Sequence, residues 1–349
     1  MECKILTHDY FNEYWDFLLE NESTLNQHLY QWKNFYDKMS GDNYYCFLLY
    51  ENSIIQASLP FVLYKCEIGN IIHSNPFHFY GGILSPLLEK EKREEVFNIL
   101  CHELIEFSRF NNCISITIST PPFSNDYELY KKCLKPDFEL PNFYQYINLK
   151  KDLLYGTNSK ERNNIKRNLK IAAKHSLKLF SDNHIDTMKE WYRIYQKRMN
   201  DINAPVNPID IFLNALQYFV PIDKAKFFYV SYNNKIIGGS LVIYHNKVID
   251  IYIAAIDTNY FFTQANTYLI YYIINWAKNK GFTYLNWQSS KSRESNVYKY
   301  KASWGCEEGT HYYLTKIVGN IDELKKVPLD IIKEKYKGHY VIPYDQFKS

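Results

Sequence analysis

Residues 227–290 carry the sequence pattern that most restricts how this chain can fold. Three runs rich in aromatic and β-branched residues lie at 227–232, 236–245 and 248–256, and only short Asn-containing turns separate them. Turns this short join antiparallel neighbours, so the three runs form a meander. The pattern therefore predicts a sheet with three adjacent antiparallel strands in the second half of the chain.

A helix and a further strand follow the meander. The helix runs from about Gln264 to Lys280, and Gly281 is well placed as the residue after its end. Its predicted apolar face consists of Tyr268, Leu269, Tyr272, Ile273, Trp276 and Ala277. The next strand is 282–288. Because a helix joins the two strands, we expect 248–256 and 282–288 to pair in parallel through a right-handed crossover.

The change from antiparallel to parallel pairing predicts a binding slot. Two strands that part at such a place leave room between them, and the crossover helix begins there. The first N–H groups of a helix have no acceptor within the helix, so they point at whatever fills the slot. We therefore expect a site that accepts an acyl carrier or a phosphate.

Residues 1–150 show a similar mixture of elements. Strand-like runs at 44–50, 54–64, 68–73 and 79–84 precede a helix at about 91–110 and strands at 113–118 and 144–149. A chain of 349 residues has room for about two domains. We predict an α/β (α+β) fold with two domains, 1–150 and 151–325, and a C-terminal tail, 326–349. Each domain is a mixed, mostly antiparallel sheet with flanking helices.

The charges are balanced overall but unevenly distributed. The chain has 41 basic and 38 acidic residues, a formal net charge of +3, whereas wholesale nucleic-acid binders are usually more basic. Residues 151–178, however, hold eight basic residues against two acidic ones, mostly on a predicted helix at about 158–176. This segment is the place where we expect phosphate groups to bind.

Several kinds of site are excluded by the motifs that the sequence lacks. The seven cysteines form no CxxC pair, which argues against a disulfide framework and a metal site and favours a reducing cytoplasm. The sequence contains no GxGxxG, GxxxxGK or GxSxG motif. It shows no signal peptide and no apolar stretch of the ~20 residues that span a bilayer, so any membrane contact is peripheral.

Four segments resemble motifs of the FemAB-like transferases. Residues 74–82 (SNPFHFYGG) resemble S-x-PF-x-x-YGG, and residues 166–177 (KRNLKIAAKHSL) resemble the helix RRNIRKAxKxGL. Residues 286–290 (NWQSS) stand where the family has a DFGRS-like strand end, and residues 297–305 (VYKYKASWG) are similar to xYRFKxxWG. The four segments occur in the family's order and span about residues 45–318. Two departures stand out: Asn286 and Gln288 replace the Asp and Gly of DFG, and Lys170-Ile171 replaces Arg-Lys in the basic helix.

The resemblance implies two tandem acyltransferase domains of the GNAT type. Members of the family attach amino acids from aminoacyl-tRNA to amines of peptidoglycan precursors, and others are N-acyltransferases that use acyl-CoA. The resemblance therefore implies an amide-forming acyltransferase without a permanently bound cofactor. Its partners would be a nucleotide-linked or lipid-linked envelope or polysaccharide precursor and the acceptor end of a tRNA.

N-acylation needs a group that steadies the oxyanion and a group that accepts the amine proton. Lys301 matches the Lys of the family's FK motif, with Tyr300 beside it, and a cation there would stabilise the developing negative charge. Strand alternation places Asp250 and Tyr252 on the face of 248–256 that can meet the slot, where either could relay the proton. These three residues, Lys301, Asp250 and Tyr252, are the predicted catalytic residues.

The predicted substrate-binding residues come from both halves of the chain. Arg167 and Lys166 head the basic helix and would grip a phosphate. Gln288 ends a strand at the carboxyl edge of the sheet and would orient a substrate amide. The first half of the chain contributes four predicted substrate-binding residues: His78, Tyr80, Gly81 and Gly82. The glycine pair lets the backbone approach a ligand, and Tyr80 would donate a hydrogen bond to the acceptor substrate. Each of these residues also has an ordinary structural interpretation, as core, turn or solvated charge.

The donor and the wider function leave alternatives open. Acetyl-CoA enzymes have a glycine-rich loop before the crossover helix, but residues 257–265 contain no glycine. Together with the basic segment, this favours aminoacyl-tRNA over acyl-CoA as the donor. Two other hypotheses remain: a non-catalytic binding module that keeps the fold, which the departures at Asn286 and Gln288 favour, and an amide-forming enzyme of small-molecule biosynthesis.

Overall fold

The computed structural model describes residues 1–39, 41–77, 80–86, 88–290 and 292–344. The chain forms two compact units: unit 1 contains Met1–Phe143 and Gly309–Ser349, and unit 2 contains Tyr144–Glu308. The division differs from the predicted boundaries, because the residues after Glu308 join unit 1 instead of the second domain and a separate tail. Contacts in unit 1 explain this: the buried His339 and Asp42 side chains are 2.8 Å apart, and the Tyr336 hydroxyl donates to Gly69 O at 2.7 Å.

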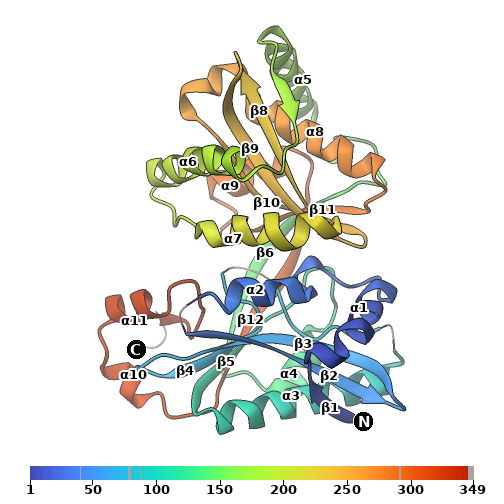
Figure 1. Ribbon diagram of the computed structural model, residues 1–349, viewed down its shortest axis with the longest axis vertical. Helices are drawn as coiled ribbons and strands as arrows, with labels where there is room; N and C mark the ends of the chain where they lie inside the picture. Colours follow the sequence, from blue (N-terminus) through green and yellow to red (C-terminus); the bar gives the residue numbers. More distant parts are fainter. Residues whose placement is uncertain (40, 78–79, 87, 291, 345–349) are drawn as a thin grey trace. The chain divides into compact units, whose positions relative to one another are not determined.

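Unit 1 is built on strands β1 to β5 and β12 (Figure 1). Their order is β1-β2-β3-β4-β5-β12, and every pair is antiparallel except β4 with β5, which is parallel. The strands are β1 (Glu2–Ile5), β2 (Asp42–Glu51), β3 (Ile54–Tyr64), β4 (Asn70–His73), β5 (Cys113–Ser119) and β12 (Glu307–Ile317). The helices are α1 (Phe11–Glu20), α2 (Lys33–Tyr36), α3 (Lys90–Phe110), α4 (Tyr127–Leu134), α10 (Asp322–Lys326) and α11 (Leu329–Lys335).

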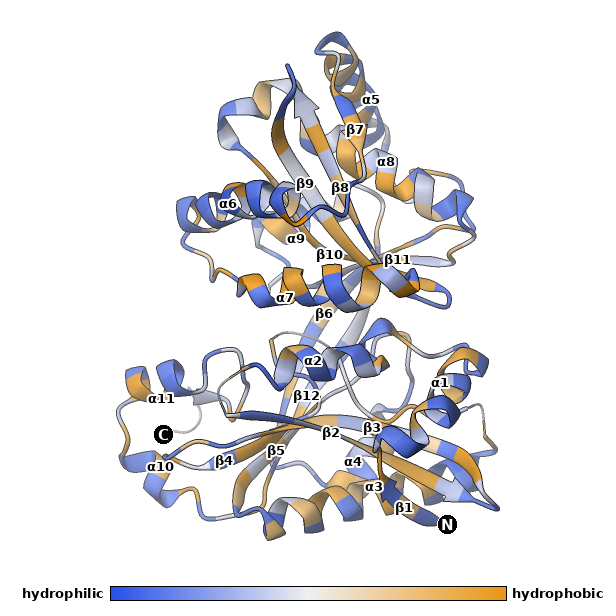
Figure 2. Ribbon diagram, in the orientation of Figure 1, coloured by the Kyte–Doolittle hydropathy of each residue, from blue (hydrophilic) through white to orange (hydrophobic). Residues whose placement is uncertain are grey.

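Helix α3 is the crossover between β4 and β5. Its apolar positions at helical spacing, Val96, Phe97, Leu100, Cys101 and Leu104, are buried against the sheet. Figure 2 shows the resulting alternation of hydrophobic and hydrophilic residues along this helix. The predicted strand 79–84 is wrong where the structure describes it, because residues 80–84 are irregular and form only a bridge between Leu84 and Ser58.

Unit 2 has the strand order β6-β11-β10-β9-β8-β7. The strands are β6 (Phe138–Asn148), β7 (Lys178–Phe180), β8 (Ala225–Tyr232), β9 (Lys235–His245), β10 (Val248–Ile256) and β11 (Tyr284–Ser290). The helices are α5 (Ser159–Lys174), α6 (Ile185–Asp201), α7 (Ile209–Asn214), α8 (Ala265–Asn279) and α9 (Asn296–Ala302). Strands β8, β9 and β10 form the predicted antiparallel meander, and β10 pairs with β11 in parallel. The predicted parallel pairing of these two strands, with a helix between them, is confirmed.

The two faces of the unit 2 sheet carry different helices. Phe228 and Val230 of β8 belong to the core beneath α5 and α8, while the alternate residues Phe227 and Tyr229 contact Trp191 of α6. Figure 1 shows α6 and α7 on the face opposite α8. Alternation along one strand thus fills two separate layers of core.

The buried stripe of α8 is rotated from the prediction. Its buried residues include Leu269, Ile270, Ile273, Ile274 and Ala277, whereas Tyr272 is 41% exposed. The sequence prediction placed Tyr272 on the buried face and left out Ile270 and Ile274. The spacing of apolar residues shows that one side of a helix is buried, but it does not show how that side is oriented toward the sheet. None of the helices in the described part of the chain is long and apolar enough to cross a membrane.

Candidate functional site

Strands β10 and β11 part soon after they meet. Their parallel ladder joins Val248 to Tyr284, Ile249 to Leu285 and Asp250 to Asn286. A β-bulge then interrupts β10 between Ile251 and Ile253, and from there to Ile256 the strand stays paired with β9. Bulges bend the strand that carries them, so β10 turns away from β11 at this point. We call the place where the two strands separate the fork.

Buried polar side chains line the fork from the strands. Asp250 and Asn286, 2% and 0% exposed, face each other, and Asn286 Nδ2 donates to Asp250 Oδ1 at 2.7 Å. The other end of the Asn286 amide, Oδ1, accepts from the backbone N–H of Gln288 at 3.2 Å. The Asn286 side chain therefore links the Asp250 carboxylate to the backbone of Gln288, two residues further along β11.

Lys301 reaches the same backbone from α9. Its ammonium donates to Gln288 O at 3.1 Å, Ser289 O at 3.2 Å and Ser290 Oγ at 3.1 Å. The side chain is buried, and burial lowers the pKa of its ammonium to about 8. No carboxylate is bonded to this ammonium among the residues that the structure describes. Burying a lysine among neutral oxygens costs free energy, and such groups are common at functional sites.

Gln288 is held on both sides in an unusual backbone conformation. Its φ is +62°, a left-handed value that costs a non-glycine residue about 1 kcal/mol or more. Asn286 holds its N–H and Lys301 holds its carbonyl oxygen. A glycine, which the DFG-like motif has at this position, would adopt this value without strain, whereas this chain has glutamine there.

The side chain of Gln288 supplies a hydrogen-bond donor to the fork. Its Nε2 is buried and has no hydrogen-bond partner in the described part of the chain. A buried amide left without an acceptor costs about 1–3 kcal/mol, so such groups usually serve a ligand or a water. The fork thus combines an unpaired amide donor, a buried ammonium and a buried carboxylate.

Helix α9 also joins the fork to the start of the crossover helix. The Tyr300 hydroxyl accepts from Asn266 Nδ2 at 2.7 Å, and the Tyr300 ring packs against Trp287 and Trp304. Burial raises the pKa of Tyr300. The first turn of α8, with Gln264 in a left-handed conformation before it, is therefore fixed against the motif that carries Lys301.

Tyr252 is placed differently from its predicted companions. It lies within the bulge, and burial together with Tyr195 of α6 raises the pKa of its hydroxyl well above 10. The raised pKa favours the protonated hydroxyl, which can donate a hydrogen bond.

The basic helix α5 opens onto a cavity. Asn158 and Glu161 form a capping box at its start, which leaves the cations free of the cap. A pocket of about 560 Å³ lies against it. The pocket is lined by Asp152, Leu153, Leu154, Tyr155, Arg162, Lys166, Leu169 and Tyr271. Lys166 and Arg167 are exposed and make no hydrogen bond or ion pair in the described part of the chain, but only Lys166 lines the pocket.

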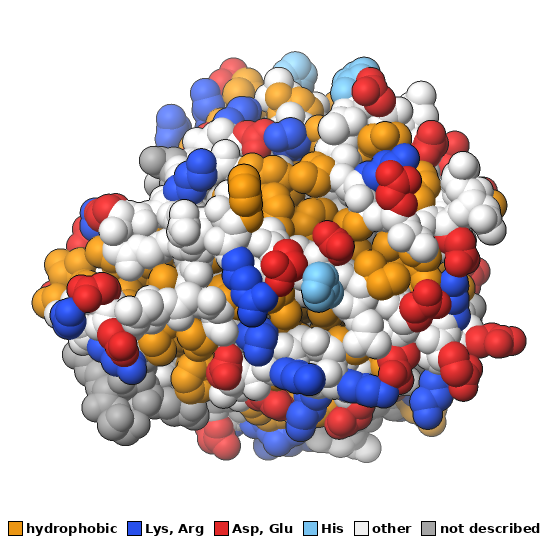
Figure 3. Space-filling view, turned by 90° about the horizontal axis from the view of Figure 1, so that it is seen from below, with side chains coloured by type: hydrophobic (Ala, Val, Ile, Leu, Met, Phe, Trp, Pro, Cys, Tyr) orange, Lys and Arg blue, Asp and Glu red, His pale blue; other side chains and the backbone are white. Residues whose placement is uncertain are grey.

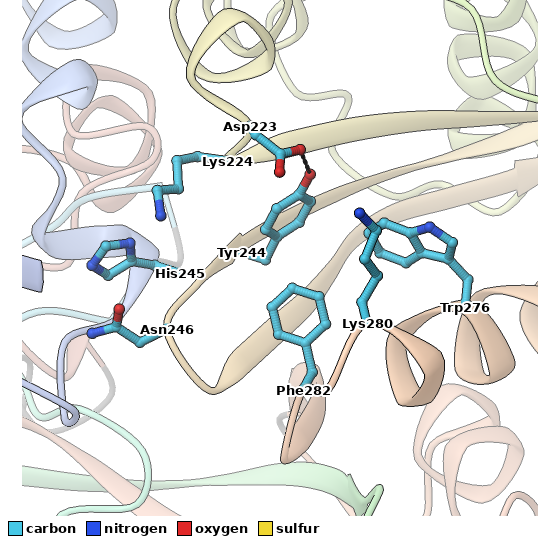
Figure 4. A pocket seen from close by; sticks show the side chains of 8 residues that line it. All are labelled: Asp223, Lys224, Tyr244, His245, Asn246, Trp276, Lys280 and Phe282. Atoms are coloured by element: carbon cyan, nitrogen blue, oxygen red, sulfur yellow. Dashed lines mark hydrogen bonds between the residues drawn. The ribbon is translucent and has the colours of Figure 1, made fainter.

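A second, smaller pocket of about 270 Å³ lies at the other end of the sheet (Figure 4). Tyr244, Trp276 and Phe282 surround it, and the Tyr244 hydroxyl donates to Asp223 at 2.7 Å. It opens beside the turn between β9 and β10, before Val248 begins β10, whereas the fork follows Asp250 further along that strand. The pocket contains none of the residues that the sequence singled out.

The remaining predicted residues belong to unit 1. Tyr80 is 1% exposed, with its ring against His311. Gly81 N donates to Ser119 O at 2.8 Å, and Gly82 has a φ of +93° with Tyr130 directly beneath it. His78 lies outside the described residues. The structure thus brings Lys301, Asp250, Gln288 and Tyr300 together at the fork, with Lys166 and Arg167 on α5, and places the Tyr80–Gly82 segment in the other unit.

Three further residues belong to the site although no sequence pattern pointed to them: Asn286, Ser290 and Asn266. Asn286 counted only as a departure from a family motif, yet it pairs with Asp250. The signal that could have found it was the predicted parallel pairing, which puts 286 beside 250 once the register is known. No group of metal-ligating side chains occurs in the described residues. On the face shown in Figure 3, basic and acidic side chains are interspersed, with no large area of one sign.

One family model and several solved structures match this chain. Residues 159–300 match the family model described as an acetyltransferase (GNAT) domain. No curated protein sequence matches the chain significantly.

Solved structures match over most of the chain. A crystal structure of FemX is 13% identical with a TM-score of 0.70, covering 90% of this chain and 97% of FemX. The C-terminal domain of a putative lysylphosphatidylglycerol synthetase from Agrobacterium fabrum is 12% identical with a TM-score of 0.59, covering 96% and 99%. A tandem GNAT protein from the clavulanic acid biosynthesis pathway is 8% identical with a TM-score of 0.54, covering 92% and 100%. These likenesses establish the fold, and the predicted tandem GNAT architecture is confirmed.

Proposed function

We propose that this chain is a FemAB-like acyltransferase of the GNAT fold, and that it moves an activated aminoacyl or acyl group onto an amine of a cell-envelope or polysaccharide precursor. The observation that carries the proposal is the fork in unit 2. There, an unpaired amide donor, a buried ammonium and a buried carboxylate meet where the parallel strands separate. The amide donor and the ammonium can steady the oxyanion that forms during amide formation, and the carboxylate can accept the amine proton, so no covalent nucleophile is needed.

In the proposed reaction the amine nitrogen attacks the donor's carbonyl carbon. The carbonyl oxygen becomes an oxyanion, which the Nε2 of Gln288 is free to hydrogen-bond. The positive charge of Lys301 lies directly behind Gln288, in a buried setting where charges act strongly. The C–O bond of an ester donor or the C–S bond of a thioester donor then breaks. The leaving hydroxyl or thiol gains the proton that the amine loses, and Asp250 is the carboxylate at the fork that can carry it.

We propose aminoacyl-tRNA as the donor. The turn before α8 is a 3₁₀ helix, Thr258–Thr263, without glycine, so it lacks the flexible backbone that wraps a pyrophosphate. Lys166 and Arg162 line the α5 pocket, and Arg167 stands beside it with no partner in the described residues, which suits phosphate groups of a tRNA acceptor end or of a nucleotide-linked or lipid-linked acceptor. Both the donor and the reducing conditions that seven free cysteines need are found in the cytoplasm, where we propose that the enzyme works.

The experiment that tests the proposal measures transfer of label to a peptidoglycan-type precursor bearing a free amine. Aminoacyl-tRNA and acetyl-CoA are offered in separate reactions. We expect transfer from aminoacyl-tRNA, and transfer from acetyl-CoA alone would overturn the donor assignment. Transfer to small amines but to no envelope precursor would instead favour small-molecule biosynthesis.

A matched pair of variants tests the fork itself. Lys301→Ala should lower turnover about 100-fold, because it removes the buried charge and releases the Gln288 turn. Lys299→Ala, on the exposed side of the same short helix α9, should keep the wild-type rate. Equal rates for the two variants would remove Lys301 from the site. Precursor binding without turnover in any reaction would indicate a non-catalytic binding module.

A further inference from the structure

The end of unit 2 that carries the 3₁₀ turn before α8 exposes a cluster of aromatic rings. Phe261 is 45% exposed and Phe262 is 55% exposed, although they are consecutive residues. The Phe262 ring contacts the rings of Tyr232, Tyr260 and His175 at centroid distances of 6.2, 6.4 and 5.2 Å. We call residues 260–262 the aromatic tip. Single exposed apolar residues are ordinary, but a contiguous group marks a surface that meets something apolar.

Cations surround the aromatic tip. The Arg198 guanidinium lies 5.4 Å from the centroid of the Phe261 ring, and the Lys235 ammonium lies 5.3 Å from that of Tyr260. Lys178 lies next to the same hairpin, 3.5 Å from Asn234 Oδ1, and Lys174 is exposed on the last turn of α5. Positive charge therefore flanks the rings from α5, α6 and the β8–β9 turn.

Acidic groups do little to offset this charge. Asp257 begins the 3₁₀ turn, but its carboxylate accepts from the N–H of Asn259 and lies 3.7 Å from the Lys197 ammonium. Asp201 follows on the last residue of α6. The tip thus presents apolar rings at its centre and an excess of ammonium and guanidinium groups around them.

We propose that the aromatic tip docks on the surface of an anionic lipid bilayer. Phenylalanine rings enter the boundary between headgroups and acyl chains, and lysine and arginine meet headgroup phosphates there. We favour lipid over a nucleic acid because exposed phenylalanine rings flanked by lysine and arginine match both the apolar and the anionic layers of a bilayer surface. The docking does not depend on the transfer reaction, and it would bring the enzyme to a lipid-linked acceptor.

The test uses the full chain and sedimentation with large unilamellar vesicles. One set contains phosphatidylcholine with phosphatidylglycerol, and the other contains phosphatidylcholine alone. We expect binding to the anionic vesicles that falls as salt rises, and much weaker binding to the neutral ones. Phe261→Ser combined with Phe262→Ser should weaken binding to the anionic vesicles at least about 10-fold.

Control variants separate docking from general stickiness. Phe110→Ser removes a ring that is 86% exposed at the end of α3 in unit 1, and it should leave vesicle binding unchanged. Lys178→Glu with Lys235→Glu should weaken binding to anionic vesicles only. Thermal melting of each variant shows that the fold is retained, and Phe262→Ser alone is the fallback if the double variant is unstable.

Three results would overturn the proposal. The first is no binding of the wild type to anionic vesicles. The second is equal loss of binding in the Phe110→Ser variant and in the tip variants. The third is that the tip variants lose binding to single-stranded RNA while vesicle binding is unaffected, which would make the tip a nucleic-acid surface.

Discussion

Units 1 and 2 contain the same strand–helix–strand crossover but end it in opposite ways. In unit 1, β4 and β5 stay joined past their last ladder pair, His73 with Thr117. Ser74 N donates to Thr117 O at 2.9 Å, and Ser119 N donates to Ser74 Oγ at 2.9 Å. In unit 2 the ladder stops at Asp250 and Asn286, and β10 bends away. One topology therefore gives a closed end in one unit and an open fork in the other.

The side chains at the closed end of unit 1 also differ in kind from those at the open fork of unit 2. Small residues complete the closed end: Ser74 supplies a hydroxyl, and Gly81 approaches close enough for its N–H to reach Ser119 O at 2.8 Å. Ionisable and amide side chains occupy the open fork, and one donor of Gln288 stays unpaired there. The comparison shows that the crossover topology fixes only where a site can form. The local side chains decide whether the two strands stay hydrogen-bonded there or separate around a site. We assign the chemistry to unit 2.

The largest expected effect comes from giving the fork the aspartate of the family motif. Asn286→Asp would place a second carboxylate against Asp250 in a buried site, and the two cannot both be ionised cheaply. We expect a loss of about 3–5 kcal/mol in the free energy of unfolding at pH 7. The loss should shrink at low pH, since like charge raises the folded-state pKa. Thr117→Val at the corresponding end of unit 1 should cost only about 1 kcal/mol, and equal losses in denaturant titrations would contradict this contrast.

Gly82→Ala should destabilise unit 1 without changing the rate of the transfer reaction. An alanine at a φ of +93° is strained, and its Cβ would overlap the hydroxyl of the fully buried Tyr130, which accepts from Ile83 N. We expect a loss of about 3 kcal/mol in stability and an unchanged turnover per folded molecule. A variant as stable as the wild type but inactive would move catalysis into unit 1.

Gln288→Gly should have the opposite effect, with turnover lost and stability nearly unchanged. Glycine accepts the left-handed φ, so relief of strain and the greater entropy of the unfolded chain nearly cancel, and stability should stay within about 1 kcal/mol. Turnover should fall about 100-fold, because the amide donor is lost. The pair of measurements is a melting curve and a steady-state rate. A faster enzyme would show that this glutamine has no part in the reaction.

The smallest effect, taken per pH unit, concerns pH and isolates Lys301. Burial lowers its pKa to about 8, whereas the unfolded value is near 10.4. Between these values the unfolded chain binds more protons, so raising the pH stabilises the wild type relative to Lys301→Met by up to about 1.4 kcal/mol per pH unit. Below pH 8 both states are protonated and the difference is constant.

Turnover should change in the other direction over the same range. If the charge of Lys301 assists transfer, the rate falls above pH 8 while stability rises. Parallel pH titrations of unfolding and of rate check this point. A rate that stays level from pH 7 to pH 10 would show that the lysine acts only by holding the Gln288 turn.

Much of unit 2 could be predicted because its signals are local. The Asn-containing turns fix a meander, and the helix between 256 and 284 leaves parallel pairing as the natural outcome. Lys301, Asp250 and Gln288 could be selected as candidates, since their types and places suit acyl transfer. Their partners could not: the bonds of Lys301 to Gln288 O and Ser290 Oγ depend on how α9 folds back over β11.

The sequence by itself determined the alternation of strands and helices, the crossover and the resemblance that led to the acyltransferase fold, because these depend on spacing along the chain. Only the tertiary structure decided that residues after Glu308 return to unit 1, where β12 pairs with β5 nearly two hundred residues earlier. It also decided which crossover end is sealed and which is open. Both outcomes follow from contacts between distant segments, and hydrophobic periodicity shows that a face is buried without showing what covers it.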